Sequence, residues 1–313
     1  MARFVVTGGA GFIGSHLVEH LLSENHEVCV IDNFSTGLRA NIQPFLNRIA
    51  LHEIDLRDAD AVKWAMDGAE YVLHQAALPS VPRSVRNPRE SHDVNATGTL
   101  NVLVAAKDAG VKRLIYASSS STYGNTNELY KHEGLISQPI SPYGVAKTCG
   151  EFYCKAFYES YGLETVSLRY FNVFGPRQNP DSPYTGVMAI FIPLMLKDQP
   201  PTIYGDGSAT RDFTFIKNNV HANLLAVSAE KAAGETMNIA CGESYSVLDV
   251  VQTINRILGK SIEPIFAPPR AGDIKHSCAF IEKAGMILNY KPLVSFEEGM
   301  AETIAWYRQK PGL

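Results

Sequence analysis

Apolar and polar positions follow two different patterns along the chain, and the change falls near residue 172. In the first part, short apolar runs alternate with segments whose apolar residues recur at helical spacing. The expected strands are Phe4–Thr7, Val28–Asp32, Ile49–Asp55, Tyr71–Gln75, Arg113–Ser118 and Thr165–Arg169. The expected helices are Ile13–Ser23, Ala61–Met66, Val94–Ala109 and Tyr143–Tyr161. This alternation predicts an α/β fold with a doubly wound parallel sheet of the Rossmann type.

Regular alternation is lost in the second part of the chain. Residues 175–185 are rich in Pro, Gly and polar side chains, which is typical of a loop at a domain boundary. Beyond it the expected elements are helices at Met188–Lys197 and Ser246–Leu258 and strands at Thr202–Tyr204 and Met237–Ala240. We expect a Rossmann-type domain at 1–172 and a smaller C-terminal α/β domain for substrate at 173–313. The segment near 212–240, and Asp212–Ala229 within it, is free to return to the first domain.

Composition narrows the class of protein. The 313 residues are 45% hydrophobic and 19% charged with a net charge of -4, as in ordinary soluble proteins. This mildly acidic balance argues against nucleic acid as the main partner, but it allows a small anionic ligand. The five cysteines lack metal-ligand spacing, so we expect free thiols in a reducing cytoplasm and no metal site. The chain enters a strand at once and lacks an 18-residue apolar run, so neither signal peptide nor membrane span is expected.

A glycine-rich turn follows the first expected strand. Gly8, Gly11 and Gly14 fit the pattern Gly-x-x-Gly-x-x-Gly, and Gly9 starts a Gly-x-Gly-x-x-Gly pattern within it. Glycines allow a tight turn and a close backbone approach to a pyrophosphate, which the N–H groups of the next helix then face. Such turns also occur without a ligand, but the position at the first strand–helix junction favours a dinucleotide site.

Acidic residues end the second and third expected strands. Asp32 lies 18 residues past Gly14, where a carboxylate can accept hydrogen bonds from the adenosine ribose. The same charge would repel a 2′-phosphate, so NAD is favoured over NADP. Asp55 is compatible with a contact to the adenine edge and equally with the cap of a helix, and the sequence leaves both open.

A phenol and an ammonium share one face of the last helix of the first part. Tyr143 and Lys147 are spaced i and i+4, and Ser141 and Pro142 suit the cap and first turn of that helix. Tyrosine titrates near pH ~10, so a base at neutral pH needs the lysine and an oxidised nicotinamide nearby. A hydroxyl run, Ser118–Thr122, ends the preceding strand, where parallel sheets bind ligands. An amphipathic helix and a serine-rich loop or cap are the non-catalytic alternatives.

With these motifs in order, the chain resembles the extended short-chain dehydrogenase/reductases and, within them, the UDP-hexose 4-epimerases. The further matching segments are His74–Ala77, Asn95–Gly98, Leu168–Asn172, Gly205–Gly207 and Arg211–Phe213. The resemblance implies a tightly held NAD and a UDP-sugar substrate. The cofactor contacts that it implies are Gly8, Gly11, Phe12, Ile13, Asp32, Asn33, Asp55, Leu56, Gln75, Tyr143 and Lys147.

The resemblance also assigns the catalytic residues. The family's Ser or Thr stands four residues before the Tyr of a Tyr-Gly pair, which selects Ser119 beside Tyr143 and Lys147. Dehydratases and decarboxylases of this group typically place acidic residues directly after that position, whereas Ser120 and Ser121 follow here. The resemblance therefore favours epimerisation, in which Tyr143 takes the proton of the sugar 4-hydroxyl, NAD takes the hydride, and the 4-keto sugar turns over before the hydride returns.

The same resemblance points to the residues that would bind substrate. Asn172, Arg211 and Arg270 would hold the UDP part, since a guanidinium can clamp a diphosphate with two hydrogen bonds. Arg177, by contrast, is interpreted as a solvated surface group. Ser277 stands where epimerases confined to non-acetylated sugars often carry a tyrosine, so it would leave room for an N-acetyl group, unless it is only a loop residue. The complete expected set is Ser80, Ser119, Ser120, Tyr143, Asn172, Arg211, Arg270, Asp273 and Ser277.

The function with the best support from sequence is therefore interconversion of UDP-GlcNAc and UDP-GalNAc, with UDP-Glc and UDP-Gal as further substrates. A dehydratase or decarboxylase of the same fold and a non-catalytic NAD-binding regulator are the alternatives. The resemblance also implies a homodimer joined through the helices Val94–Ala109 and Tyr143–Tyr161. The alternative is a monomer in which loops of the same chain cover the surface of these helices. Apolar residues on these helices are Val102, Leu103, Phe152, Phe157 and Tyr158.

Overall fold

A seven-stranded parallel sheet organises the larger part of the molecule. The computed structural model describes residues 1–126, 128–179, 186–269 and 276–310. Within them the sheet order is β12-β7-β5-β4-β1-β2-β3, and every pair is parallel. The strands are β1 Arg3–Thr7, β2 Glu27–Ile31, β3 Ile49–His52, β4 Tyr71–His74, β5 Arg113–Ser119, β7 Glu164–Tyr170 and β12 Thr236–Ile239. The predicted Rossmann-type fold is confirmed, and the strand order reverses between β1 and β4.

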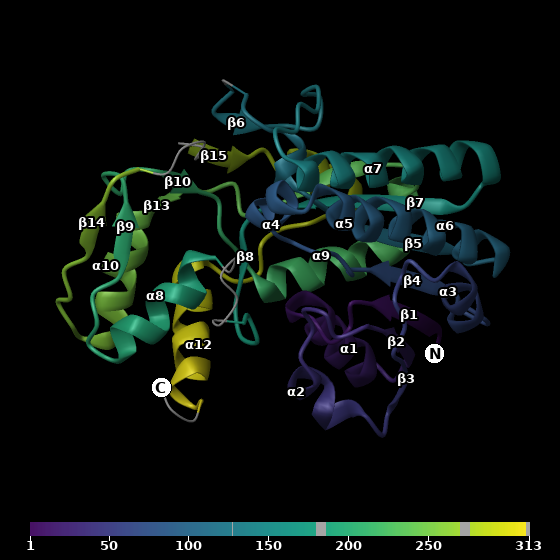
Figure 1. The fold of residues 1–313 in the computed structure, drawn as a ribbon, viewed down its shortest axis with the longest axis horizontal. Helices are drawn as coiled ribbons and strands as arrows, with labels where there is room; N and C mark the ends of the chain where they lie inside the picture. The colour runs from purple at the N-terminus through teal and green to yellow at the C-terminus, as the bar shows by residue number, and fades with distance from the viewer. Residues whose placement is uncertain (127, 180–185, 270–275, 311–313) are drawn as a thin grey trace.

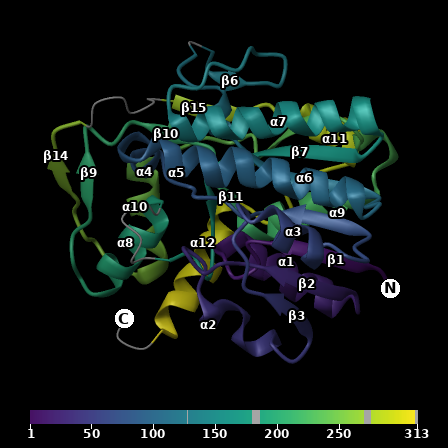
Figure 2. The same ribbon diagram turned by 45° about the vertical axis from the view of Figure 1, so that its right-hand side comes forward.

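Helices cover both faces of this sheet (Figures 1 and 2). On one face lie α1 (Phe12–Ser23) and α9 (Ile216–Ser228). The other face carries α3 (Ala59–Ala65), α6 (Gly98–Asp108) and α7 (Pro142–Tyr161), packed side by side. Each face has its own buried apolar cluster, because a parallel sheet with crossover helices is shielded from water on both sides.

The large sheet draws on residues beyond 172. Strand β12 pairs with β7, from Thr236 opposite Ser167 to Ile239 opposite Tyr170. Helix α9 packs on α1 and against β5 and β7. The chain thus leaves the sheet after β7, builds part of a second lobe, and comes back to complete the edge of the first.

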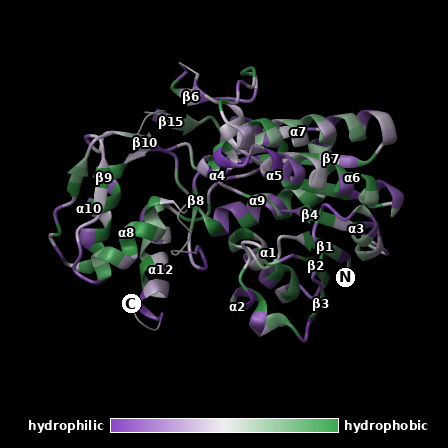
Figure 3. Cartoon of the chain, viewed as in Figure 1, coloured by the Kyte–Doolittle hydropathy of each residue, from purple (hydrophilic) through white to green (hydrophobic). Residues whose placement is uncertain are grey.

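A smaller lobe lies to one side of the sheet and contains helices α8, α10 and α12 (Figure 1). These span Val187–Leu196, Val247–Leu258 and Phe296–Arg308. Helix α8 is apolar along its length (Figure 3) and packs against both of the others. A four-stranded sheet β13-β10-β15-β6 and the pairs β11-β8 and β14-β9 complete the second part. Their bounds are β6 Tyr130–Lys131, β8 Val173–Phe174, β9 Thr202–Tyr204, β10 Thr210–Arg211, β11 Thr214–Phe215, β13 Tyr245–Ser246, β14 Ile265–Ala267 and β15 His276–Ala279.

Several elements differ from the expected ones. Strand β3 ends at His52, short of the expected end at Asp55, because the chain turns there: the N–H of Ile54 bonds back to the His52 carbonyl oxygen at 3.1 Å. The expected helix Val94–Ala109 begins with a π-helical segment at Asp93–Thr97 before α6. The remaining short elements are α2 Arg39–Ile42, η1 Gln43–Phe45, α4 Val81–Arg86, α5 Pro88–His92, η3 Ser120–Thr122, η4 Glu230–Ala232 and α11 Glu282–Leu288.

The helix surfaces assigned to a partner are mostly internal. Val102, Leu103 and Phe157 are buried in the apolar cluster between α3, α6, α7 and the sheet, so their placement on an outer surface is wrong. Phe152 of α7 is exposed, and Tyr158 is half-buried. All five cysteines are free thiols, as expected. None of the helices in the described residues is both long and apolar enough to cross a bilayer.

Candidate active site and dinucleotide cradle

The glycine turn after β1 fits closely against the neighbouring strand end. Gly8 has a φ of +69°, and a Cβ there would lie 2.7 Å from the backbone nitrogen of Ala76. A Cβ on Gly14 would lie 2.1 Å from the carbonyl oxygen of Gly8, so both positions require glycine. Helix α1 follows with Gly11 as its N-cap, without a side-chain cap and without an acidic residue in its first turn. Its first N–H groups, beginning at Phe12 and Ile13, are therefore suited to an anion.

A buried histidine ties this turn to the next strand. The Thr7 hydroxyl bonds Nδ1 of His74 at 2.7 Å, and Nε2 of His74 bonds the Thr99 hydroxyl at 3.0 Å. Because Thr99 donates its own proton to the Asn95 carbonyl oxygen, it accepts from Nε2, which fixes the proton of the neutral ring there. Burial and the charge of Lys147 lower the pKa of His74 to about 3, so the ring is neutral at physiological pH.

The Asp32 carboxylate lies at the carboxyl end of β2 beside the glycine turn. It accepts the N–H groups of Ala10 at 2.9 Å and Phe34 at 2.8 Å. A Cβ on Gly37 would lie 2.9 Å from both of its oxygens, so the backbone passes close to the carboxylate. Burial raises the pKa of Asp32, and the two N–H groups act in the opposite direction. Asp32 is thus fixed in place where the ribose of a dinucleotide would be recognised.

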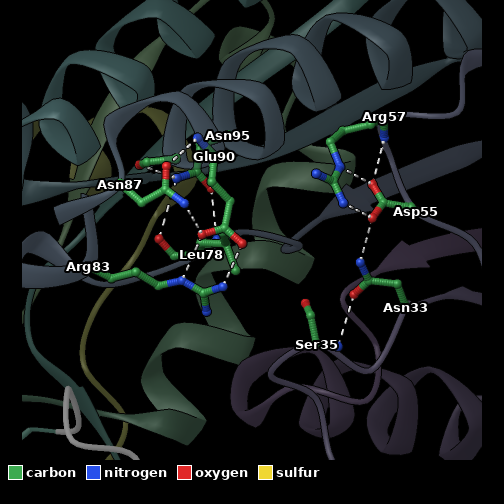
Figure 4. A network of polar contacts seen from close by, with 10 residues as sticks. Asn33, Ser35, Asp55, Arg57, Leu78, Arg83, Asn87, Glu90 and Asn95 are labelled. Carbon is green, nitrogen blue, oxygen red and sulfur yellow. Dashed lines mark hydrogen bonds and ion pairs between the residues drawn. The ribbon is translucent and has the colours of Figure 1, made fainter. Parts of the chain in front are cut away.

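Asn33, Asp55 and Arg57 form a network next to Asp32 (Figure 4). The Asn33 amide donates to Asp55 at 2.9 Å, and Arg57 donates twice to the same carboxylate, at 2.9 and 2.7 Å. The Arg57 side chain in particular holds the pKa of Asp55 well below its usual range. Asp58, not Asp55, caps α3, which rules out the capping alternative for Asp55. Next to this network, Leu56 is buried, and its carbonyl oxygen accepts from Asn101 at 2.8 Å.

Gln75 bridges elements rather than pointing alone into a pocket. Its Oε1 accepts from the Tyr170 hydroxyl at 3.1 Å, and its amide donates to Asn223 at 3.2 Å. The Asn223 amide in turn donates to the Tyr170 hydroxyl at 2.9 Å. The triangle joins the ends of β4 and β7 to α9, and both the oxygen and the nitrogen of the Gln75 amide are bonded within the protein.

The segment after Gln75 is held by a second polar cluster, also drawn in Figure 4. The Ser80 hydroxyl caps α4 by accepting the N–H of Arg83 at 3.0 Å. The guanidinium of Arg83 pairs with Glu90 at 2.8 Å, and Asn95 accepts the N–H of Leu78 at 2.8 Å. Ser80 is buried, and its oxygen already serves as a helix cap, which sequence reasoning about a substrate contact did not foresee.

Helix α7 places the expected catalytic pair against the carboxyl end of β5. Ser141 caps the helix and Pro142 stands in its first turn, as predicted. The ammonium of Lys147 donates to the Ala117 carbonyl oxygen at 2.8 Å. Its nitrogen lies 6.0 Å from the centre of the Tyr143 ring and 5.0 Å from that of Tyr116.

Ser119, at the end of β5, completes the group. Its hydroxyl donates to the Ser121 hydroxyl at 3.0 Å and accepts the Ser121 N–H at 3.1 Å, so Ser119 also caps the short helix η3. The hydroxyl run is therefore both a cap and part of the site, with Ser120 as the first residue of η3. Ser119 also hydrogen-bonds with the Tyr143 side chain. The structure thus brings the three residues Ser119, Tyr143 and Lys147 together, and Ser121, which the sequence offered only as a member of the hydroxyl run, orients Ser119.

Burial works against the charged forms of both catalytic groups. It raises the pKa of Tyr143 to about 12, although the hydrogen bond with Ser119 acts in the other direction. It lowers the pKa of Lys147 to about 8, with Cys154 and Glu151 opposing the change. The ammonium is still the main form at neutral pH, and the phenol needs a further positive charge before it can lose its proton.

Two of the expected substrate residues lie side by side on adjacent strands of the small sheet. Arg211 of β10 is paired in register with Ser277 of β15, and the N–H of Asp212 donates to the Ser277 carbonyl oxygen at 2.9 Å. Asn172 adopts a φ of +33° and donates its amide to the Asp212 carbonyl oxygen at 2.8 Å. Arg211, Ser277 and Asn172 are thus joined through Asp212. Arg270 and Asp273 lie outside the described residues.

Arg177 is not a solvated surface group, so that interpretation is wrong. Its guanidinium donates to the Ser15 carbonyl oxygen at 3.1 Å and pairs with Glu19 at 2.5 Å, and the side chain is only 18% exposed. Next to it, His16 bonds the Pro176 carbonyl oxygen at 3.0 Å, and burial lowers the pKa of His16 to about 4. Both contacts join the loop after β8 to helix α1.

Comparisons with known proteins agree with this fold and place the chain in a family. Residues 4–240 match the model of the NAD dependent epimerase/dehydratase family. A putative UDP-glucose 4-epimerase of Methanocaldococcus jannaschii is 39% identical over 97% of this chain and 98% of its own length. The UDP-glucose 4-epimerase of Thermotoga maritima, solved with UDP-glucose, is 38% identical with a TM-score of 0.93, covering 98% of both chains. The UDP-N-acetylglucosamine 4-epimerase of Methanobrevibacter ruminantium, solved with UDP-N-acetylmuramic acid, is 39% identical with the same TM-score and coverage.

A parallel sheet with a glycine cradle at its switch point, next to the buried Tyr143 and Lys147 and the half-buried Ser119, is the arrangement of a dinucleotide-dependent enzyme. The chain belongs to the NAD dependent epimerase/dehydratase family, and its cofactor is NAD. The residues present fit this group. The close approach of Gly8 to Ala76 leaves the uncapped start of α1 for the pyrophosphate, and the fixed Asp32 carboxylate suits an unphosphorylated ribose.

Proposed function

We propose that this protein is a UDP-hexose 4-epimerase. The observation that carries the proposal is the assembly of Ser119, Tyr143 and Lys147 at the carboxyl end of β5, two strands from the glycine cradle of β1. The names of the relatives from Methanocaldococcus jannaschii and Thermotoga maritima support it.

In the proposed reaction, Tyr143 removes the proton of the sugar 4-hydroxyl, and Ser119 holds that hydroxyl and shares its proton. NAD held by the glycine turn and Asp32 would supply the redox chemistry at C4, taking up a hydride and giving one back, so that the sugar undergoes no net oxidation. The buried phenol has a high pKa, so the Lys147 ammonium and the positive ring of the oxidised cofactor are both needed to stabilise the phenolate. Because Lys147 is held by the Ala117 carbonyl oxygen, it acts as a fixed charge and not as a proton carrier.

The residues that follow Ser119 favour epimerisation over elimination or decarboxylation. A dehydratase needs an additional acid close to the reacting carbon, and Ser120 and Ser121 occupy the positions after Ser119. The Ser121 hydroxyl is used to orient Ser119. A non-catalytic regulator would not require the buried Tyr143 and Lys147 to be retained together.

For the substrate we propose UDP-sugars, with Asn172, Arg211, Arg270 and Asp273 around the UDP part and Ser80, Ser120 and Ser277 toward the sugar. Arg211 and Ser277 are neighbours in the small sheet, which supports placing the diphosphate and the sugar side by side there. A serine at 277 leaves space for a 2-acetamido group. We therefore propose UDP-GlcNAc/UDP-GalNAc as a substrate pair in addition to UDP-Glc/UDP-Gal.

A homodimer is proposed with the enzyme. Along the outer side of α7 lies an apolar groove of about 400 Å³, lined by residues that include Val145, Phe152 and Tyr153. Val145 is 52% exposed and Phe152 69% exposed, which is unusual for large apolar side chains on a helix whose other face is buried. A second copy of the same groove would cover both residues symmetrically. Sedimentation of the wild type against a Phe152→Glu variant tests this, because the charge should shift the protein to monomer.

The function is tested by incubating purified protein separately with UDP-GlcNAc and UDP-Glc and following the C4 epimers by NMR. Conversion of each sugar to a mixture of its two C4 epimers, without net oxidation of the sugar, is the expected result. An unchanged sugar, a stable 4-keto sugar or a decarboxylated sugar would contradict the proposal. The ratio of the two rates reports the sugar preference.

A further inference from the structure

A buried carboxylate, Glu151, follows the proposed catalytic residues Tyr143 and Lys147 on the same face of α7. Tyr143, Lys147 and Glu151 are spaced at i, i+4 and i+8, and each contacts the last residues of β5. Tyr143 hydrogen-bonds with Ser119, Lys147 donates to the Ala117 carbonyl oxygen, and the Glu151 carboxylate accepts from the Ser118 hydroxyl. Three successive turns of the helix are thus fixed to three successive residues of the strand.

Glu151 is a buried charge with a dedicated partner. Its side chain is 5% exposed and that of Arg169 is 7% exposed. Arg169 of β7 donates to both carboxylate oxygens, at 2.8 and 2.7 Å. Two parallel hydrogen bonds of this kind fix the direction of a carboxylate as well as its charge.

Arg169 is in turn held from the other side. Its guanidinium carbon lies 4.6 Å from the centre of the Tyr123 ring, and the Tyr123 hydroxyl donates to Asn238 at 2.7 Å. Asn238 belongs to β12, the strand that returns from the second lobe. The carboxylate of Glu151 therefore rests on a chain of contacts that runs across β7 to the edge of the sheet.

We propose that Glu151 is a positioning residue for the reaction: through Ser118 it fixes the end of β5, and with it the Ser119 hydroxyl, against the catalytic face of α7. Ser118 and Ser119 are adjacent, and side chains of adjacent strand residues point to opposite faces. A hydrogen bond on Ser118 therefore constrains the peptide that carries Ser119 without occupying the hydroxyl itself. The inference rests on the proposed epimerase function.

The negative charge of Glu151 also supports the reaction, because it favours the charged ammonium form of Lys147. Its negative charge opposes the lowering of the Lys147 pKa, alongside Cys154 from the same helix. Tyr143 of α7, Tyr116 of β5 and the neutral His74 of β4 also lie around Lys147. Arg169 supplies the opposite charge that a buried carboxylate requires.

The main test is Ser118→Ala. It removes the hydroxyl that donates a hydrogen bond to Glu151 and leaves both hydrogen bonds from Arg169 to that carboxylate. The matched control is Thr165→Val. Thr165 lies on the neighbouring strand β7 and is buried. Its hydroxyl donates to the Cys154 carbonyl oxygen of α7 at 2.7 Å, and Cys154 is three residues beyond Glu151. Both variants lose one buried hydrogen bond between a strand and α7, so their losses of stability should be similar.

A positioning role predicts that Ser118→Ala lowers kcat about tenfold or more, because misplacement of a reacting group acts on the chemical step. The KM for the UDP-sugar and the amount of NAD bound per subunit should each change less than about twofold. Thr165→Val should keep kcat near that of the wild type. Glu151→Gln, which keeps the length of the side chain but not its charge, should lower kcat further than Ser118→Ala.

The inference is overturned if Ser118→Ala retains wild-type kcat, or if Thr165→Val loses as much kcat as Ser118→Ala, since the effect would then be one of stability. An inactive wild type would instead overturn the proposed function and this inference with it. Activity in the wild type with an unaffected Ser118→Ala variant overturns the positioning role alone.

Discussion

The Arg177 guanidinium lies 2.5 Å from a carboxylate oxygen of Glu19, although the two residues are 158 positions apart in the chain. Glu19 belongs to α1, the helix whose start faces the dinucleotide cradle, and Arg177 follows the point where the chain leaves the large sheet. Arg177 has a φ of +67°, so the backbone accepts strain to place its side chain. The contact fastens the second lobe to the cofactor-binding helix.

Two substitutions separate the side chain of Arg177 from its backbone strain. Arg177→Ala removes the contacts to Glu19 and Ser15 but keeps a Cβ in the left-handed region. It should lower the free energy of unfolding by about 1–2 kcal/mol and speed the loss of bound NAD. Arg177→Gly loses the same contacts but relieves the strain, so it should be more stable than Arg177→Ala by about 1 kcal/mol.

Denaturant unfolding and the NAD retained after gel filtration are the measurements for the Arg177 variants. Glu19→Gln, which weakens the ion pair and leaves the bond to Ser15, should fall between the wild type and Arg177→Ala. Equal stability of all four proteins would contradict a fastening role for this contact.

Removing the phenol hydroxyl of Tyr143 tests the catalytic assignment. Tyr143→Phe should lower turnover by about 10²- to 10⁴-fold, since a general base is lost while the ring still fills its buried site. Bound NAD should remain, because the glycine cradle and Asp32 do not depend on the hydroxyl. Epimer formation followed by NMR and the NAD content of the purified variant check the two halves. Turnover near the wild-type rate would exclude Tyr143 as the base.

His74 makes the stability of the protein depend on pH. Its pKa is about 3 in the folded state against an ordinary value of 6.5, so the unfolded chain binds more protons between these values. Stability is therefore complete above about pH 6.5 and is lost as the pH falls, by about 2 kcal/mol between pH 7 and pH 5. The advantage of the wild type over a His74→Gln variant should shrink by this amount in denaturant unfolding at the two pH values. A constant difference would mean that His74 titrates normally.

The strands and the cradle could be predicted because their signals are local. Alternating apolar runs give the six strands of the first part, and Gly8, Gly11 and Gly14 stand directly between a strand and a helix. Helical spacing predicted that Tyr143 and Lys147 share one face of a helix, but their interpretation as a catalytic pair also needed the hydroxyl run after the preceding strand and the family resemblance. The small sheet was not, because two-residue strands such as β6 and β10 are too short to show a period.

Contacts between distant segments were also beyond the reach of the sequence. The residues around Arg177 have the composition of a surface loop, and only folding brings the Arg177 side chain into contact with α1. Val102 and Leu103 lie on an apolar helix stripe that fits a partner surface and an internal core equally well, and the structure assigns them to the core. Glu151 follows the helical spacing of Tyr143 and Lys147, so the spacing could have found it, but its role depends on Ser118 and Arg169.

The size of the residue at position 277 should decide which sugars are accepted. Ser277 is 9% exposed on β15, directly beside Arg211. Ser277→Tyr adds a phenol ring at this point, so the rate with UDP-GlcNAc should fall at least about tenfold relative to the rate with UDP-Glc, because a 2-acetamido group needs the space that the ring fills. Ser277→Ala, which adds no bulk, should leave the ratio of the two rates unchanged. If both sugars lose activity in the same proportion in Ser277→Tyr, position 277 does not line the part of the pocket next to C2.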